Sequence, residues 1–269
     1  MSDATQVWES PVKKRLRNGE PVIAATITVN SVDVAAHAAT MGFDFLWIEM
    51  EHSPITLETL RNMVLATRGM KTQTFARVPV NEIWMAKRVL DAGASGVMFP
   101  FTSTPELATQ AVAACRYPPV GRRGSGANLA KLCWPGGEAY HDSADKNVTV
   151  IVIIEEARAV ENVEAIAATP GIDAMFIGTS DLSFSLGLRG NQDHPRLNEA
   201  VETVITAAKR HGKIVGRPAA SPALVKQYLE QGFLLFQAPT ELGFMAAGAR
   251  DYLEPLGRST VKARGKAIY

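Results

Sequence analysis

The chain has 269 residues, of which 46% are hydrophobic and 20% are charged, with 28 Lys and Arg set against 27 Asp and Glu. A formal net charge of +1, without a long block of one sign, argues against a protein that binds nucleic acid or an anionic membrane. No apolar run approaches the roughly 18 residues that span a bilayer, and the first residues lack the pattern of a secretory signal, so we expect a cytoplasmic protein. Two cysteines, Cys115 and Cys133, form neither a CxxC motif nor a disulfide framework, which argues against a structural zinc site.

Short runs of β-branched or aromatic residues alternate with longer stretches of helical spacing from residue 22 almost to the end of the chain. Strands that are apolar along their whole length are buried on both faces, as in a parallel sheet covered by helices. The predicted strands are 22–29, 45–50, 73–78, 96–101, 148–155, 174–179, 214–218 and 234–239.

Eight such units favour a closed (β/α)8 TIM barrel over a doubly wound open sheet, which usually has fewer strands. No GxGxxG or GxxxxGK[ST] motif follows an early strand, which also argues against the open sheet. We therefore predict one barrel domain over residues 1–269. A Gly- and Pro-rich insert at 117–147 begins at the amino-terminal face of the barrel, and a basic tail occupies 257–269.

Active sites of TIM barrels lie at the carboxyl ends of the strands, so polar residues at these positions are the candidates. They come from four predicted strands: Glu49, Glu51 and His52; Arg77; Glu155 and Glu156; and Gly178, Thr179, Ser180 and Asp181.

Glu155 and Asp181 provide hard oxygen ligands suited to Mg²⁺ or Mn²⁺, with water and substrate completing the coordination. The alternative is that each carboxylate caps a helix or lies at the rim. His52 is the one histidine of five at a strand end, and Glu49 could orient its ring as a general base; a solvated strand end is the alternative. Arg77 suits a carboxylate or an enolate oxygen, or a structural ion pair.

The stretches IEMEHSP, ARVP, RYPPVGRRGSG, VIIEEARAVEN and FIGTSDLSFSLG, in this order and spacing, resemble the HpcH/HpaI aldolases, which are metal-dependent class II pyruvate aldolases. The resemblance covers residues 20 to 255. It implies a (β/α)8 barrel of the phosphoenolpyruvate/pyruvate type that reversibly cleaves a 4-hydroxy-2-keto acid into pyruvate and an aldehyde. The pyruvate enolate would be held on a divalent metal ion, Mg²⁺, Mn²⁺ or Co²⁺.

The same resemblance implies a role for each candidate residue. Glu155 and Asp181 correspond to the metal ligands, His52 with Glu49 to the base, and Arg77 to the residue that stabilises the enolate. The pyruvate carboxylate would bind the backbone N–H groups of Ser180 and Asp181, next to Gly178. No lysine lies at a strand end, which disfavours a Schiff-base aldolase.

The resemblance further implies a homo-oligomer, often a hexamer, and we expect the insert around Trp134 to Tyr140 to contact a neighbouring subunit. Three features depart from the family pattern. Glu49 and Met50 replace an Asp and a Gly, Ile153 replaces a Gln, and the segment 216–222 differs and adds Arg217, which we expect near the barrel mouth. Two alternatives stay open, an acyl-CoA lyase like the citrate-lyase β subunit and a non-catalytic protein that binds 2-keto acids.

Overall fold

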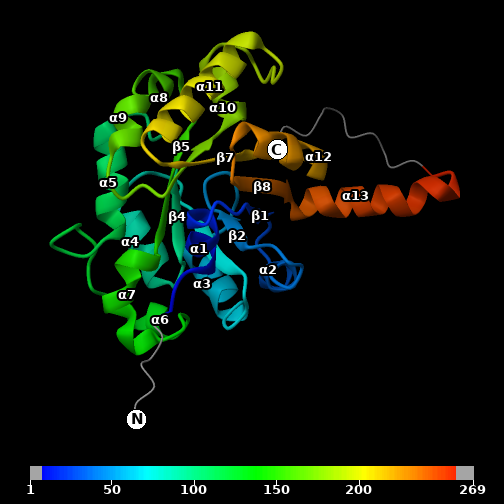
Figure 1. The fold of residues 1–269 in the computed structure, drawn as a ribbon. Helices are drawn as coiled ribbons and strands as arrows, with labels where there is room; N and C mark the ends of the chain where they lie inside the picture. The colour runs from blue at the N-terminus through cyan, green and yellow to red at the C-terminus, as the bar shows by residue number, and fades with distance from the viewer. Residues whose placement is uncertain (1–7, 259–269) are drawn as a thin grey trace.

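The computed structural model describes residues 8–258, which form a closed barrel of eight parallel strands in chain order (Figure 1). Seven strands lie inside the predicted runs and β8 extends one residue beyond its run, so the predicted TIM barrel is confirmed. The strands are β1 (Val22–Ile27), β2 (Phe45–Glu49), β3 (Gln73–Arg77), β4 (Gly96–Phe99), β5 (Thr149–Ile154), β6 (Ala174–Ile177), β7 (Ile214–Pro218) and β8 (Leu235–Thr240).

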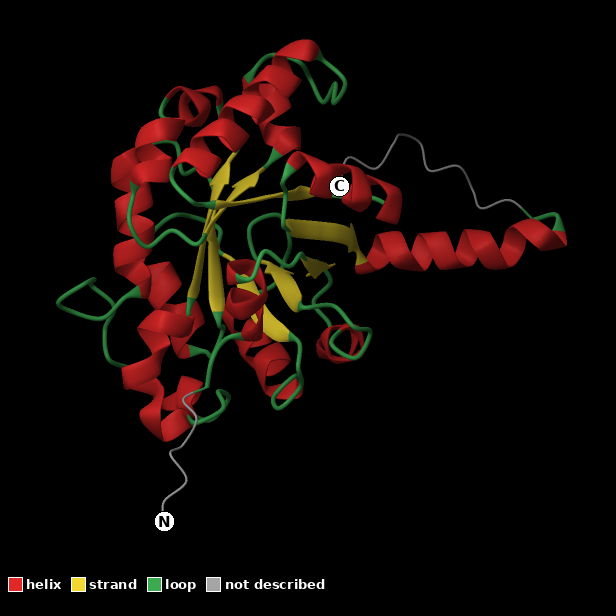
Figure 2. Cartoon of the chain, in the orientation of Figure 1, coloured by secondary structure: helices red, strands yellow, loops and turns green. Residues whose placement is uncertain are grey.

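Helices connect the strands and surround most of the barrel (Figure 2). Several start where a Ser or Thr side chain accepts a hydrogen bond from the backbone N–H three residues later, as Ser31, Thr56 and Thr104 do. The helices are α1 (Pro11–Arg17), α2 (Val32–Ala38), α3 (Leu57–Ala66), α4 (Ile83–Asp91), α5 (Pro105–Cys115), α6 (Asn128–Lys131), η1 (Gly137–Ala139), α7 (Tyr140–Asn147), α8 (Ala157–Glu161), α9 (Val163–Ala168), α10 (Thr179–Ser185), α11 (Pro195–Arg210), α12 (Pro222–Gln231), α13 (Glu241–Leu253) and η2 (Glu254–Leu256). Within residues 8–258 no helix is long and apolar enough to cross a membrane.

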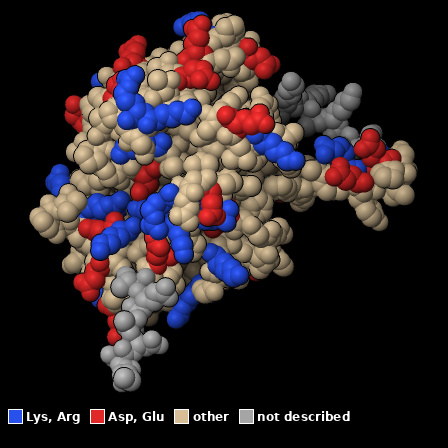
Figure 3. Space-filling model, viewed as in Figure 1, with Lys and Arg blue, Asp and Glu red and all other residues tan. Residues whose placement is uncertain are grey.

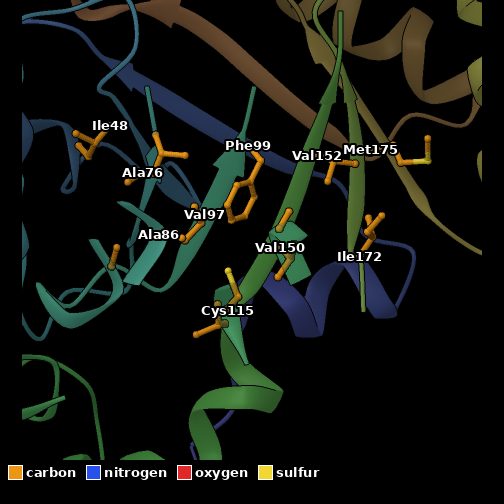
Figure 4. Close-up of a cluster of buried hydrophobic side chains, with 14 of the residues drawn as sticks. Ile48, Ala76, Ala86, Val97, Phe99, Cys115, Val150, Val152, Ile172 and Met175 are labelled. Atoms are coloured by element: carbon orange, nitrogen blue, oxygen red, sulfur yellow. The ribbon is translucent and has the colours of Figure 1, made fainter. Parts of the chain in front are cut away.

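Successive side chains of each strand alternate between two apolar clusters. One cluster fills the space between the barrel and its helices, and Figure 4 draws part of it, including Val97, Val150 and the buried Cys115. The other fills the barrel interior with large side chains such as Phe45, Phe75 and Phe176. The interior is therefore a packed core, and a polar site can form only at its ends.

The insert at 117–147 lies at the amino-terminal side of the barrel, as expected, and contains α6, η1 and α7. Trp134 packs edge-on against Trp8 and Tyr140, and its indole N–H donates to the carbonyl of Gly93 at 3.0 Å. Trp134 is 7% exposed and Tyr140 is 1% exposed. These two aromatic side chains are thus used inside the chain, and the expected contact of the insert with a neighbouring subunit stays a prediction.

The last barrel helix, α13, projects away from the barrel and does not cover it (Figure 1). None of its residues is buried, and Leu242, Phe244 and Met245 are among the exposed large hydrophobic side chains. A cavity of about 490 Å³, mostly apolar, lies where α13 leaves the outer side of β1 beside α2. Basic and acidic side chains are interspersed over the face drawn in Figure 3, as the balanced charge predicts. The expected basic tail, apart from Gly257 and Arg258, lies outside the described residues.

We expect Trp134→Ala to lower the free energy of unfolding by about 3 kcal/mol, because it removes a buried aromatic side chain and the partner of a buried carbonyl. The matched control is Leu132→Ala, in the same insert and half-exposed, which should change stability by less than about 0.5 kcal/mol. Urea denaturation measures both values. A Trp134→Ala protein of unchanged stability but altered oligomeric state would contradict the intrachain role.

Candidate active site

The strand alternation directs three of the predicted site residues into the barrel. Phe45 and Trp47 belong to the interior cluster, so Glu49, two residues further along β2, also faces inward at the strand's carboxyl end. The same count leads from Phe75 to Arg77 on β3 and from Ile153 to Glu155 after β5. Glu49 and Arg77 are directly paired in the β2–β3 register.

Arg77 is the central cation of the site. Its Nε lies 2.7 Å from Oε2 of Glu49 and 3.0 Å from Oε2 of Glu51, and all three side chains are nearly inaccessible to solvent. Burial lowers the pKa of Arg77, but the charges of Glu49 and Glu51 outweigh it and raise the pKa above its ordinary value. Arg77 therefore stays charged and keeps the two carboxylates in place.

Glu49 and Glu51 contact His52 in different ways. Oε1 of Glu49 accepts the backbone N–H groups of Glu51 at 2.8 Å and His52 at 3.0 Å, which closes the turn after β2. Oε2 of Glu51 lies 3.7 Å from Nε2 of the half-exposed His52 ring. The sequence singled out Glu49 as the partner of the base, whereas Glu51 was noted only for its position at a strand end.

Glu155 is 1% exposed, and the backbone N–H of Phe101 donates to its Oε1 at 2.7 Å. The pKa of Glu155 is raised to about 7, mainly by burial and also by the neighbouring charge of Asp181, against the lowering effect of the Phe101 N–H and Arg77. Gly178 lies against this carboxylate, since a Cβ there would be 2.9 Å from Oε2. The backbone of Gly178 can approach Glu155 this closely only because glycine has no Cβ.

The site holds more negative than positive charge. The pKa of Glu51 is raised to about 7, mainly by burial; Arg77 opposes this rise, and the charges of Glu155, Glu49 and Asp181 contribute to it. Four carboxylates thus interact around one guanidinium, and a bound cation would relieve their repulsion. Among residues 8–258 no three His, Cys, Asp or Glu side chains are arranged to hold a metal ion by themselves. Mg²⁺ commonly uses one or two carboxylates plus water and substrate, so Glu155 and Asp181 fit such an ion.

Ser180 and Asp181 lie in the first turn of α10, whose N-cap is Gly178. No side chain caps this helix start. Ile153 is fully buried below Glu155 in the interior cluster, and Met50 faces the outer cluster. These two departures from the family pattern are thus accommodated as apolar core.

Arg217 does not lie at the barrel mouth, so that expectation is wrong. Its guanidinium carbon is 3.8 Å from the centre of the Tyr228 ring of α12 and 5.3 Å from the centre of the Phe233 ring. Gly216 faces the interior, against Leu235 and Phe176, so the next residue points outward. Burial lowers the pKa of Arg217.

Comparison with known proteins identifies the family. The family described as HpcH/HpaI aldolase/citrate lyase matches residues 27–247. The chain belongs to this family.

Two family relatives are 5-keto-4-deoxy-D-glucarate aldolases. That of Klebsiella pneumoniae subsp. pneumoniae is 40% identical over 202 residues, which cover 75% of this chain and 79% of the relative. That of Salmonella arizonae is 37% identical over 228 residues, covering 85% and 87%. The crystal structure of an HpcH/HpaI aldolase/citrate lyase family protein from Burkholderia cenocepacia J2315 has a TM-score of 0.85 and 34% identity, over 93% of this chain and 100% of that one. The expected family, the fold and an aldolase type of lyase are thereby confirmed.

The buried Glu51 predicts a pH-dependent stability of the chelator-treated protein. Its pKa is raised from 4.5 to about 7, so between these pH values the folded state binds more protons than the unfolded state. Stability is therefore fully present at low pH and decreases as the pH rises through this window.

Urea midpoints measured at intervals from about pH 5 to about pH 8 should fall with rising pH, and should fall less steeply for Glu51→Gln, which cannot ionise. Glu58→Gln, which changes an exposed carboxylate on α3, is the matched control. Parallel slopes for wild type and Glu51→Gln would contradict the burial of a charged Glu51.

Proposed function

We propose that this HpcH/HpaI family member is a class II pyruvate aldolase that uses a divalent metal ion to cleave a 4-hydroxy-2-keto acid into pyruvate and an aldehyde. The observation that carries the proposal is the buried carboxylate of Glu155, which interacts electrostatically with both Asp181 and Arg77. A metal site and a guanidinium next to each other suit the keto oxygen of a 2-keto acid, on which negative charge develops as the carbon–carbon bond breaks.

Each side chain of the cluster has a task in this mechanism. Glu155 and Asp181 would hold the metal ion, which supplies Lewis-acid polarisation of the keto group when bound. Arg77, kept charged by Glu49 and Glu51, stabilises the developing negative charge on the keto oxygen. His52, half-exposed at the rim, takes the proton of the C4 hydroxyl group.

The remaining carboxylates and amides position these groups. Glu51, 3.7 Å from the His52 ring, can stabilise the ring when it carries the proton, while Glu49 holds the turn on which His52 lies. The backbone N–H groups of Ser180 and Asp181 would receive the carboxylate of the 2-keto acid. The aldehyde leaves, and the enolate takes up a proton at C3 to become pyruvate.

The relatives point to a first substrate to test. Their name describes a deoxy sugar diacid, 5-keto-4-deoxy-D-glucarate, in which a keto group next to a carboxylate is separated by one methylene from a hydroxyl-bearing carbon. Cleavage between that methylene and the hydroxyl-bearing carbon releases pyruvate. We therefore propose a hydroxylated dicarboxylic 2-keto acid of this kind as substrate.

Removing the metal ion or its ligands tests the proposed chemistry. Chelator treatment should abolish pyruvate release from 5-keto-4-deoxy-D-glucarate, and Mg²⁺, Mn²⁺ or Co²⁺ should restore it. Glu155→Ala with Asp181→Ala should lower kcat/KM by about a thousandfold or more, since charge stabilisation by the site is lost. Full activity after chelation would refute metal dependence, and oxalate binding without any turnover would favour the non-catalytic alternative.

We also propose that the protein is a homo-oligomer in which α13 packs on a neighbouring copy. The exposed Leu242, Phe244 and Met245 line the cavity of about 490 Å³ beside β1 and α2 together with the apolar side chains of those elements. Exposed apolar faces of this kind are typical of subunit contacts. The apolar side chains of α13 from a neighbouring copy would suit this apolar cavity.

Met245→Glu should therefore lower the mass measured by light scattering after size-exclusion chromatography, because it places a charge in an apolar contact. Met245 is 67% exposed in the single chain, so the chain itself should stay folded. Arg250→Glu, a charge change elsewhere on α13, is the control. A monomeric, fully active wild-type protein would refute the proposal.

A further inference from the structure

The segment after β4 contains an aromatic residue in an unusual backbone conformation. Phe101 has a φ of 47°, in the left-handed region that side chains other than Gly, Asn and Asp rarely adopt. Phe101 is 45% exposed and is not part of the apolar core. Unfavourable conformations of this kind persist where neighbouring contacts determine them.

Hydrogen bonds on the two following residues provide these contacts. The backbone N–H of Thr102 donates to the carbonyl of Ile153 at 3.3 Å, and its hydroxyl donates to the carbonyl of Phe99 at 3.0 Å. The Ser103 hydroxyl donates to Glu156, and the Asn162 side chain donates to the Ser103 carbonyl at 2.9 Å. The chain after Phe101 is thus fixed to β5 and the segment that follows it.

The result of this conformation is the position of one N–H group. The Phe101 N–H points at Oε1 of Glu155, 2.7 Å away, on a carboxylate that is almost completely buried. On the other oxygen, Oε2, the missing Cβ of Gly178 leaves a space that any side chain would fill. One oxygen of Glu155 is held by the backbone, and the other lies next to Gly178 at the start of α10.

We propose that Phe101 is a positioning residue: its left-handed backbone aims the N–H at Glu155 and so sets the orientation of this carboxylate for binding the divalent cation. This inference rests on the proposed function, in which Glu155 is a metal ligand. The role belongs to the backbone and not to the ring. Residue types that adopt positive φ readily should preserve it, and β-branched residues should not.

Three substitutions at this position separate backbone from side chain. Phe101→Gly and Phe101→Asn remove the ring but allow the left-handed conformation, whereas Phe101→Val keeps an apolar side chain and disfavours that conformation. Phe184→Val, an exposed phenylalanine on the ordinary helical backbone of α10, is the matched control.

The measurement is the affinity of the chelator-treated, full-length protein for Mn²⁺ by titration calorimetry, with the thermal midpoint of the metal-free protein as a second readout. We expect Phe101→Val to bind Mn²⁺ about tenfold more weakly or worse, as for other residues that orient a metal ligand. Phe101→Gly, Phe101→Asn and Phe184→Val should remain within about threefold of wild type. If Phe101→Val does not fold, the Mn²⁺ affinities of Phe101→Gly and Phe101→Asn test the positioning role.

Wild-type affinity in Phe101→Val, or equal loss in the Gly and Asn variants, would overturn the positioning role alone. A wild-type protein that binds no Mn²⁺ would instead overturn the proposed function, and the inference with it.

Discussion

The pairing of Arg77 with Glu49 across the β2–β3 register is the interaction on which the rest of the site depends. Burying a carboxylate without a partner is costly, and this barrel buries Glu49, Glu51 and Glu155 close together. One guanidinium cannot neutralise four interacting carboxylates. The pKa values of Glu51 and Glu155 are therefore raised to about 7, and a further cation bound at this end of the barrel would reduce the repulsion between the carboxylates.

The apolar barrel interior makes this concentration of charge possible. Trp47, Phe75 and Ile153 fill the layer directly below the charged residues and exclude water from it. In such surroundings each charge interacts more strongly than it would in water. The same layer explains how Ile153 can replace the amide expected from the family pattern, because at this position it contributes to the floor of the site.

Much of this arrangement could be predicted from the sequence, because it follows from strand period and strand ends. Counting by two from interior residues leads to Glu49, Arg77 and Glu155, and the same count places Arg217 on the outer face, where proximity to a strand end misled the prediction. The burial of Trp134 could not be predicted in this way, since its partners Trp8 and Gly93 are distant in sequence. The left-handed backbone of Phe101 could not be predicted either. It is imposed by the hydrogen bonds of Thr102 and Ser103, and nothing in the sequence at Phe101 indicates it.

The projecting helix and the site are connected through the end of β1. Glu241, the first residue of α13, accepts the backbone N–H groups of Thr28 at 2.8 Å and Val29 at 2.6 Å, at the carboxyl end of that strand. The direction in which α13 leaves the barrel is thus set at the same end at which the carboxylates gather. The insert, by contrast, lies at the amino-terminal end, where Trp134 contacts the turn before β4. A neighbouring copy packed on α13, as proposed, would therefore act close to the segment after β1 at the mouth of the barrel, whereas the insert lies at the opposite end.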